Sequence, residues 1–331
     1  MAPNLRALLL LSALALPSAA GELVIDSVEY AGWDDCLRLS NGEVELIATT
    51  QVGPRIIHFG PVGGENVFWV CPSDAGSTGG DAWRIYGGHR LWASPETKPR
   101  TYPPDNFPVQ ITEGAWGVRL APPEERDNGI QKEIDIRMLT DAPGAVITHR
   151  IRNTGRWPIE LAPWALSVTD AGGIAIIPTP QGDADPYGLL PNRMIALWPY
   201  SDMTDPRLTW GSEYLLLRQD PSATVAFKLG VSADSNWMAC ANKGMCFVKL
   251  FHYQPGQRYP DFGSSVECYA NADMLELETL GPLVTLEPGQ AVEHTEHWFL
   301  YQDVPAGDTE QWARETIRPL AVQSLDRANL D

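Results

Sequence analysis

Apolar and aromatic residues recur along the chain in short runs, with turn-forming residues between them. Gly, Pro, Asn and Asp separate the runs, and the chain holds 29 Gly and 28 Pro. Short runs at this spacing are typical of strands joined by turns. The pattern therefore predicts an all-β fold, a large antiparallel β-sandwich. The predicted strands are 43–48, 55–59, 109–111, 116–120, 130–139, 145–153, 159–167, 174–178, 214–218, 224–229, 237–241, 245–251, 264–269 and a closing pair within 274–300.

Helical periodicity is nearly absent, and the one exception lies close to the C-terminus. Asp308 precedes a segment with helical spacing, and Gln311 follows three residues later, as in a capping box. We expect a short helix over 308–318 that packs on the sandwich. The chain is long enough for two domains, but large all-β sandwiches reach this size as one unit. We therefore expect a single β-sandwich domain over residues 21–331.

The first 20 residues have the pattern of a secretory signal peptide. Arg6 comes before an apolar run over 7–16, and small residues occupy 18–20, where a signal peptidase cleaves. The run is shorter than the roughly 20 residues that a membrane-spanning helix needs. We expect residues 1–20 to be a signal peptide that is cleaved after Ala20. The protein is then exported, to the periplasm or the extracellular space, without membrane insertion.

The chain carries a strong negative charge. Its 24 Lys and Arg and 42 Asp and Glu give a formal charge of −18, and loss of Arg6 with the signal peptide gives 23 − 42 = −19. Nucleic acid and anionic lipid are poor partners for such a surface. The sequence has no phosphate-loop, dinucleotide-binding or zinc-protease motif, and we predict no cofactor and no metal site. The oligomeric state cannot be predicted from these patterns.

The five cysteines are too few for a disulfide scaffold. Cys240 and Cys246 flank the turn-like segment 241–245, and a hairpin there would bring them near each other. A disulfide between them and two free thiols are both compatible with this spacing.

A dense group of polar and aromatic residues lies inside a loop-rich region over 65–108. Gly87 and Gly88 allow a close approach of the backbone there. Sugars are bound by planar hydrogen-bonding groups, and their apolar C–H faces pack on aromatic rings. This combination indicates a carbohydrate-binding loop. In the alternative, its charged residues pair with each other and its tryptophan belongs to the core. The candidate residues are His89, Arg90, Trp92, Glu96, Asp105 and Asn106.

Two glutamates define a second candidate region. Glu276 and Glu278 are two residues apart in a predicted strand, so both side chains point to one face, and Leu275 and Leu277 point to the other. This acidic face lies either in solvent or in a ligand groove. We expect the loop near residue 90 and this strand to meet over one sugar-sized hollow.

The segment that runs from Leu277-Glu-Thr279 through 286–300 resembles the closing strands of the galactose mutarotase (aldose 1-epimerase) superfamily. There, a Leu-Glu-Thr strand carries the catalytic base, and Glu278 matches that position. The segment Gly87-Gly-His-Arg-Leu-Trp-Ala-Ser-Pro-Glu96, with Tyr102-Pro-Pro-Asp-Asn106, is similar to a motif of an uncharacterised, mostly bacterial domain family within the superfamily. The resemblance implies that His89, beside the two glycines, contacts the sugar.

One departure from the superfamily bears on catalysis. Mutarotases open the sugar ring with a base at the anomeric hydroxyl and an acid at the ring oxygen. The superfamily's acid is a His in a strand that looks like 159–168 here, and Trp164 takes its place. Trp164 would then stack on the sugar, and His89 or His58 would have to supply the acid.

Three functions are compatible with these patterns. An exported carbohydrate-binding protein would use the candidate residues as a recognition surface. An epimerase-like enzyme would use Glu278 as the base, Glu276 as a like-charged neighbour that raises its proton affinity, and His89 as the acid. A structural or interaction β-sandwich would use the Trp-rich loops as an interface, and it predicts a flat surface in place of a cleft.

Overall fold

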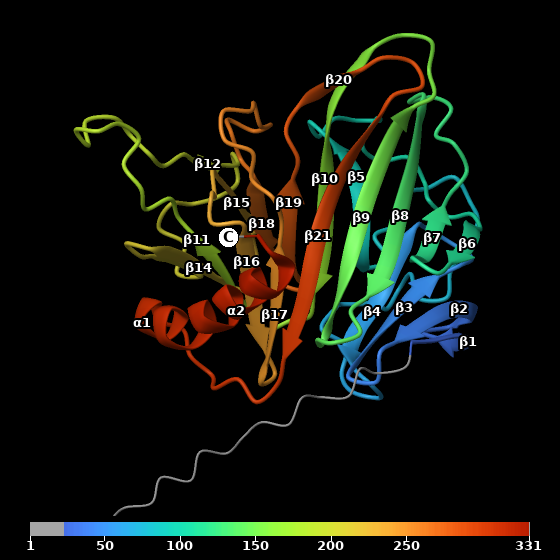
Figure 1. The fold of residues 1–331 in the computed structure, drawn as a ribbon, viewed down its shortest axis with the longest axis horizontal. Coiled ribbons are helices and arrows are strands. Elements are labelled where there is room, and N and C mark those ends of the chain that lie inside the picture. The colour runs from blue at the N-terminus through green and yellow to red at the C-terminus, as the bar shows by residue number, and fades with distance from the viewer. Residues whose placement is uncertain (1–22, 331) are drawn as a thin grey trace, which may run out of the picture.

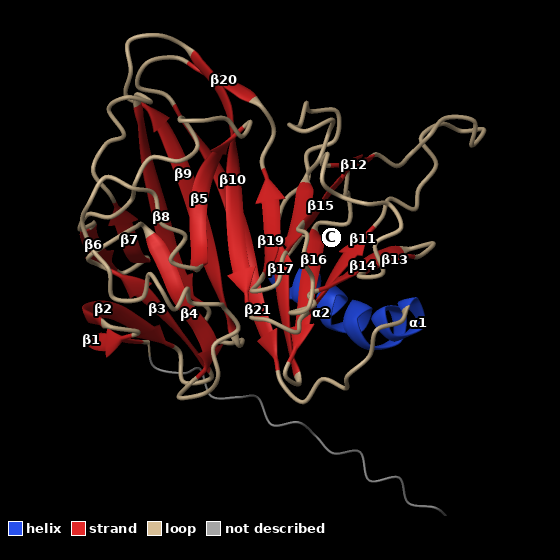
Figure 2. Ribbon diagram, turned by 180° about the vertical axis from the view of Figure 1, so that it is seen from behind, coloured by secondary structure: helices blue, strands red, loops and turns tan. Residues whose placement is uncertain are grey.

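The computed structural model describes residues 23–330, so the predicted signal peptide (1–20) lies outside the described residues. Two large antiparallel sheets are stacked face to face. Figure 1 shows the ten-stranded sheet in front, and Figure 2 shows the eleven-stranded sheet from the opposite side. This architecture confirms the predicted antiparallel β-sandwich.

Each sheet combines strands that are neighbours in the sequence with strands that are far apart in it. The eleven-stranded sheet has the order β1 (Val24–Tyr30), β2 (Trp33–Ser40), β3 (Val44–Thr49), β4 (Arg55–Pro61), β5 (Gly88–Ser94), β10 (Ile159–Thr169), β19 (Leu275–Leu280), β18 (Val266–Ala270), β15 (Phe227–Val231) and β12 (Ile195–Leu197), with β20 (Val284–Leu286) paired to β10. The ten-stranded sheet has the order β13 (Leu208–Trp210), β14 (Tyr214–Arg218), β11 (Ile174–Pro178), β16 (Trp237–Asn242), β17 (Met245–Leu250), β21 (Ala291–Tyr301), β9 (Gly144–Asn153), β8 (Ile130–Met138), β7 (Gly117–Ala121) and β6 (Gln110–Gly114).

The space between the sheets is filled by apolar side chains that alternate along the strands. In β8, Ile134, Ile136 and Met138 are buried, while the charged residues between them are more exposed. Aromatic rings from both sheets meet at the centre, where the ring of Phe59 in β4 lies 5.7 Å from that of Phe247 in β17. A period of two residues therefore places the core where the sequence pattern predicted it.

The C-terminal helical segment begins two residues later than predicted and continues further. Thr309 caps it in place of Asp308, since the Thr309 Oγ1 accepts the Trp312 N–H at 3.1 Å. Asp308 instead pairs with Arg218. The buried helical residues pack on the outer face of the ten-stranded sheet (Figure 1). No helix in the described part of the chain is long and apolar enough to cross a membrane. The segments are α1 (Glu310–Trp312), a π-helical turn (Ala313–Ile317) and α2 (Arg318–Ala328).

The region predicted as loop over 65–108 contains the strand β5, and this is the main correction to the predicted fold. Gly87 and Gly88 have φ values of 94° and 67°. A Cβ at Gly88 would lie 2.3 Å from the carbonyl oxygen of Ile56, so glycine lets the chain enter the sheet beside β4. All seven residues of β5 are buried. Because β5 is a strand, its consecutive side chains point to opposite faces of the sheet.

The hairpin of β16 and β17 holds the two cysteines for which a disulfide was considered. Cys240 lies opposite Phe247, and Cys246 lies opposite Ala241. Cys240 packs in the core between the sheets, whereas Cys246 packs toward the C-terminal helix. All five cysteines are free and buried. The disulfide alternative is therefore wrong, because the register directs the two thiols to opposite faces.

Candidate functional site

A cavity of about 250 Å³ opens on the outer face of the eleven-stranded sheet, and we call it the aromatic cavity. Its floor is built from β5, β10, β19, β18 and β15, which are adjacent in that sheet (Figure 2). The register places Trp92 opposite Trp164, and Tyr269 opposite both Glu276 and Lys228. Alternate residues of five strands therefore face one side. The lining residues are Trp83, Ile85, Arg90, Trp92, Glu96, Tyr102, Trp164, Leu166, Tyr200, Lys228, Tyr269, Met274 and Glu276.

Trp92 lies at the centre of an aromatic cluster in this cavity. Its ring centroid lies 5.3 Å from that of Trp164 and 5.1 Å from that of Tyr102, in edge-on arrangements. The ring of Trp83 lies 5.8 Å from that of Trp92. Rings at these separations attract each other and restrict one another's rotation. The cavity therefore has rigid aromatic walls, which suit the apolar C–H faces of a sugar.

Arg90 and Glu276 join the two candidate regions of the sequence. The Arg90 Nη2 donates to the Glu276 Oε1 at 3.0 Å, and both side chains are almost fully buried. The Arg90 guanidinium also lies 4.4 Å from the ring of Trp92. The Nε and Nη1 of Arg90 have no hydrogen-bond partner among residues 23–330. Arg90 thus keeps two buried donor groups unfilled beside the cavity, and a small shift of its side chain would let a bound hydroxyl accept from them.

Glu278 lies on the same face of the sheet as Glu276, in a buried charged cluster next to the cavity. The Trp164 Nε1 donates to its Oε2 at 2.7 Å, and the Lys228 Nζ donates to the same oxygen at 3.0 Å. Lys228 also lies 2.7 Å from Glu267, the residue opposite Glu278 on β18. The Lys228 ammonium is held 4.5 Å from the ring of Trp164 and 4.6 Å from that of Trp198. Lys228 lines the cavity, and Glu278 is covered by it and by Trp164.

Burial governs the protonation of this cluster. Loss of solvation raises the pKa of Glu278, although Lys228 lowers it in part. The same cause raises the pKa of Glu267 well above its usual value. Burial lowers the pKa of Lys228, but the two carboxylates raise it by more, so Lys228 stays an ammonium. One ammonium beside two buried carboxylates leaves one negative charge uncompensated, which favours a proton on one of the carboxyl groups.

His89 lies on the opposite face of β5 from Arg90 and Trp92, and it points into the space between the sheets. It is fully buried, with its Nδ1 2.9 Å from the Ser167 Oγ and its Nε2 2.7 Å from the His149 Nε2. The structure therefore does not bring His89 and Glu278 to one cavity, and the predicted role of His89 as the acid loses its geometric basis. The physical reason is the alternation of side chains along a strand that the sequence analysis took for a loop.

His58, the other residue considered as the acid, is also remote from the aromatic cavity. Its Nδ1 lies 3.1 Å from the Tyr30 hydroxyl, and its Nε2 lies 3.7 Å from Glu45. Burial lowers the pKa of His58 to about 4, so the imidazole is neutral at physiological pH.

No family model matches the sequence, and no curated protein matches it. Solved structures match it by shape. A galactose mutarotase-like protein from Lactobacillus casei has a TM-score of 0.52 at 10% identity, over 80% of this chain and 100% of that one. A "putative aldose 1-epimerase" from Klebsiella pneumoniae has a TM-score of 0.55 at 12% identity, over 87% of this chain and 83% of that one. The chain has the galactose mutarotase-like fold.

The same fold matches part of a larger protein. A TPR-domain containing protein from Parabacteroides distasonis has a TM-score of 0.54 at 13% identity. The match covers 83% of this chain and 48% of that protein. Similarity at this level of identity establishes the galactose mutarotase-like fold alone. The fold alone does not specify a ligand, because one fold can host many functions.

Asp105 and Asn106 hold the 103–107 loop in place and do not line the aromatic cavity. Asp105 pairs with Arg55 at 2.7 Å. Asn106 is buried, accepts the Tyr86 hydroxyl at 2.9 Å and donates to two backbone carbonyls. These internal bonds occupy the Asn106 amide and one oxygen of Asp105, and the other Asp105 oxygen is buried. Their predicted role in sugar binding is therefore not supported by their positions.

The remaining predicted residues lie at the cavity or directly next to it. Glu96 is at its rim and accepts the Tyr102 hydroxyl. Lys228, Tyr200 and Tyr269 also line the cavity and were not predicted from the sequence. The lysine had a usable signal, because a Lys within an apolar strand is rarely buried unless a carboxylate pairs with it. The predicted site residues that line the cavity are Arg90, Trp92, Glu96, Trp164 and Glu276.

A second polar cluster lies between the sheets, behind the cavity floor. Ligand atoms of His89, His149 and Glu296 lie within 4.8 Å of one another, which is close enough for one metal ion. The Lys249 Nζ lies 2.9 Å from Glu296 and also donates to the carbonyls of Ala165 and Leu277. Lys249 is therefore an interior residue. It already supplies the positive charge that a metal ion would bring to Glu296.

The hydrogen bonds of this cluster account for its two histidines. The His149 Nδ1 lies 2.8 Å from the His294 carbonyl and must donate to it, so the His149 Nε2 accepts the proton of the His89 Nε2. Burial lowers the pKa of His89 and brings that of His149 to about 3, which keeps both rings neutral. A metal ion could bind here only by displacing these bonds.

Proposed function

We propose that this protein binds a carbohydrate in the aromatic cavity. The observation that carries the proposal is the combination of Trp92, fixed among other rings, with Arg90, which keeps two buried donors unfilled. Drug-sized ligands occupy sites of roughly 300–1,000 Å³. A cavity of about 250 Å³ therefore suits one small ring with hydroxyl groups.

The fold and the charge support a sugar over other ligands. Proteins of this shape include one described as galactose mutarotase-like. The formal charge of −18 disfavours polyanions. A structural or interaction sandwich was expected to have a flat surface here, and a walled cavity with unfilled donors favours a ligand.

Titration with sugars distinguishes a sugar-binding protein from a structural or interaction sandwich. Isothermal calorimetry of the protein without its predicted signal peptide, over a panel of monosaccharides and methyl glycosides, is expected to find at least one binder. Trp92→Ala is expected to weaken it at least about tenfold, since it removes a stacking surface and a cavity wall. Trp157→Ala is the matched control, because Trp157 is 79% exposed and does not line the cavity. Absence of any binder, or equal binding by the Trp92 variant, would contradict the proposal.

A second candidate is epimerase-like acid–base chemistry with Glu278 as the base. Two observations favour it: the Oε1 of Glu278 has no partner among the described residues, and burial raises the pKa of Glu278, which makes the carboxylate a stronger base. Anomer exchange measured by NMR, for a sugar that binds, tests it. Glu278→Gln is expected to abolish any exchange above the uncatalysed rate, and exchange that persists in this variant would refute the assignment.

We also propose that the protein is exported, on the basis of the pattern over residues 1–20. The test is N-terminal sequencing of the protein recovered from the periplasm and the medium after expression of the full chain. Gly21 is expected as the first residue. Recovery from the cytoplasm alone, with Met1 retained, would contradict export.

A further inference from the structure

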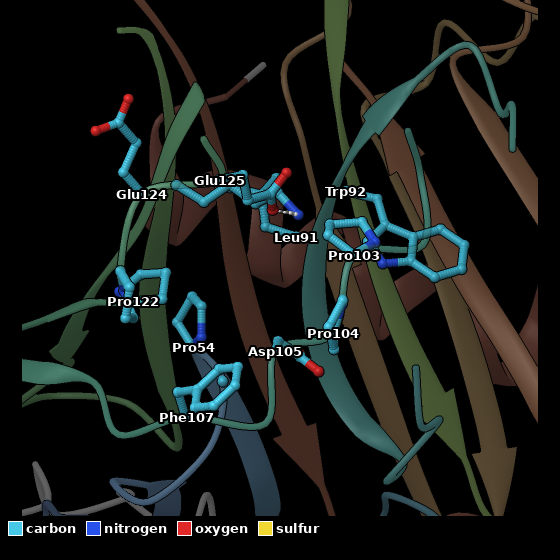
Figure 3. A pocket seen from close by; sticks show the side chains of 13 residues that line it. Pro54, Leu91, Trp92, Pro103, Pro104, Asp105, Phe107, Pro122, Glu124 and Glu125 are labelled. Carbon is cyan, nitrogen blue, oxygen red and sulfur yellow. Dashed lines mark ion pairs between the residues drawn. The ribbon is translucent and has the colours of Figure 1, made fainter. Parts of the chain in front are cut away.

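A second cavity, of about 200 Å³, lies beside β5, and we call it the proline pocket (Figure 3). Figure 3 shows Trp92 at one end and Pro54, Phe107 and Pro122 toward the other. The residues that line it are Gly53, Pro54, Leu91, Trp92, Pro103, Pro104, Asp105, Phe107, Pro122, Pro123, Glu124, Glu125 and Lys132.

The pocket exists because β4 and β5 separate. The two strands pair only at Ile56 and His89, so the rest of the β5 edge that faces β4 is covered by loops, while the other edge pairs with β10. The 103–107 loop is tied to the turn before β4 by a hydrogen bond from the Gly53 N–H to the Asp105 carbonyl at 2.7 Å. The Arg55–Asp105 ion pair strengthens the same connection. One wall of the pocket is therefore formed before any ligand arrives.

The opposite wall is held by an ion pair between strand β8 and the loop that precedes it. Lys132 of β8 lies 2.5 Å from Glu125, which also accepts an N–H of the Asn128 side chain at 2.7 Å. Prolines have a fixed φ, and those on both sides of the pocket restrict the remaining motion of the loops. A preformed pocket loses little conformational freedom when a ligand binds.

The polar groups of the proline pocket are occupied except for the Asp105 Oδ1, which has no partner among the described residues but is buried. Asp105 is paired with Arg55, and Glu125 is paired with Lys132. Glu124 accepts the Thr154 hydroxyl at 2.6 Å, and its side chain points away from the prolines (Figure 3). A second sugar ring would therefore leave several hydroxyl groups without partners in this pocket. An apolar group would bury its surface against Leu91, Phe107 and the prolines without that penalty.

The two cavities are neighbours on either side of one residue. Trp92 lines both of them. Tyr102 of the aromatic cavity is followed directly by Pro103 and Pro104 of the proline pocket. We propose that the ligand is a glycoside whose sugar ring occupies the aromatic cavity and whose apolar aromatic or alkyl aglycone occupies the proline pocket. This inference rests on the proposed function and specifies its ligand class.

Paired glycosides test the inference. Methyl and phenyl β-D-galactopyranoside, and the same pairs for glucose and mannose, are titrated by calorimetry into the protein. The phenyl glycoside of the sugar that binds is expected to bind at least about tenfold tighter than the methyl glycoside, because it buries a whole ring in place of one methyl group. Phe107→Ala is expected to remove this preference without weakening the methyl glycoside. Phe107→Leu, which keeps an apolar side chain, is expected to retain most of it.

The controls separate this inference from the function on which it rests. Phe262→Ala is the matched control for Phe107→Ala, because Phe262 is 84% exposed and lines neither cavity. Equal affinity for phenyl and methyl glycosides, or a phenyl preference that survives Phe107→Ala, would overturn the inference and leave sugar binding intact. Failure of every methyl glycoside to bind would overturn the proposed function itself.

Discussion

The buried Lys228 is the residue whose removal tests the electrostatics of the site most directly. Its ammonium lies between Glu267 and Glu278, at 2.7 Å and 3.0 Å, and 4% of the residue is exposed. Lys228→Met keeps the length of the side chain and removes the charge. The two carboxylates, which are opposite each other on β18 and β19, then face each other without a cation.

The expected loss of stability can be worked from these distances. At an effective dielectric constant of about 20, each contact contributes roughly 6 kcal/mol of attraction, and the desolvation of three charged groups offsets much of it. Removal of one partner from a buried ion pair costs about 3–5 kcal/mol. We therefore expect Lys228→Met to lower the free energy of unfolding by about 3–5 kcal/mol at pH 7.5.

The pH dependence provides a second signature. Burial raises the pKa of both carboxyl groups, so the penalty for ionising them is fully present above the folded-state pKa and disappears as the pH falls toward the ordinary value of 4.5. The difference in stability between the native protein and Lys228→Met is thus expected to shrink as the pH is lowered from 7.5 to 5. The triple variant Lys228→Met/Glu267→Gln/Glu278→Gln is expected to recover most of the loss at pH 7.5, since no buried charge remains.

Urea unfolding followed by tryptophan fluorescence and far-ultraviolet circular dichroism measures these changes. Lys243→Met is the matched control, because Lys243 also contacts two carboxylates, Glu65 and Asp170, but its side chain is 42% exposed. An exposed pair contributes about 0–1 kcal/mol. If Lys228→Met loses no more stability than Lys243→Met, or if its loss is the same at pH 7.5 and pH 5, Lys228 does not stabilise two buried carboxylates.

Three further outcomes are expected. Burial brings the pKa of His149 and His294 to about 3, below the usual 6.5, so their contribution to stability is present above pH 6.5 and is lost as the pH falls toward 3. At pH 5, each buried neutral histidine lowers the free energy of unfolding by about 2 kcal/mol. The free energy of unfolding falls between pH 7.5 and 5, and His149→Gln is expected to make this fall smaller by that amount. An unchanged fall would show that the ring is not buried neutral. Thr309→Ala is expected to lower the unfolding free energy by about 1 kcal/mol through loss of the helix cap, measured in urea, and no change would mean that the cap is not formed. A reducing agent is expected to leave the midpoint of urea unfolding unchanged, since all five cysteines are free, and a lower midpoint would indicate a disulfide.

Much of the fold could be predicted because the sequence pattern of a strand depends only on residues that are close together in the chain. The period of two in β8 marks one buried face, and the turn-forming residues mark the ends of most strands. The same period placed Glu276 and Glu278 on one face, which the structure confirms. The strand β5 was missed because its entry through Gly87 and Gly88 and its exit at Pro95 look like a loop. That one error moved His89 to the wrong face of the sheet.

The amino-acid sequence by itself determined the all-β class, the pairing of faces along each strand and the excess of negative charge, since these depend on residues close together in the chain or on composition alone. Only the tertiary structure decided which side chains meet. Lys228, Tyr269, Glu276 and Trp164 form one site because β15, β18, β19 and β10 lie side by side in one register. Contacts between strands so distant in the chain depend on the order in which the sheet is assembled, and no local pattern of residues records that order.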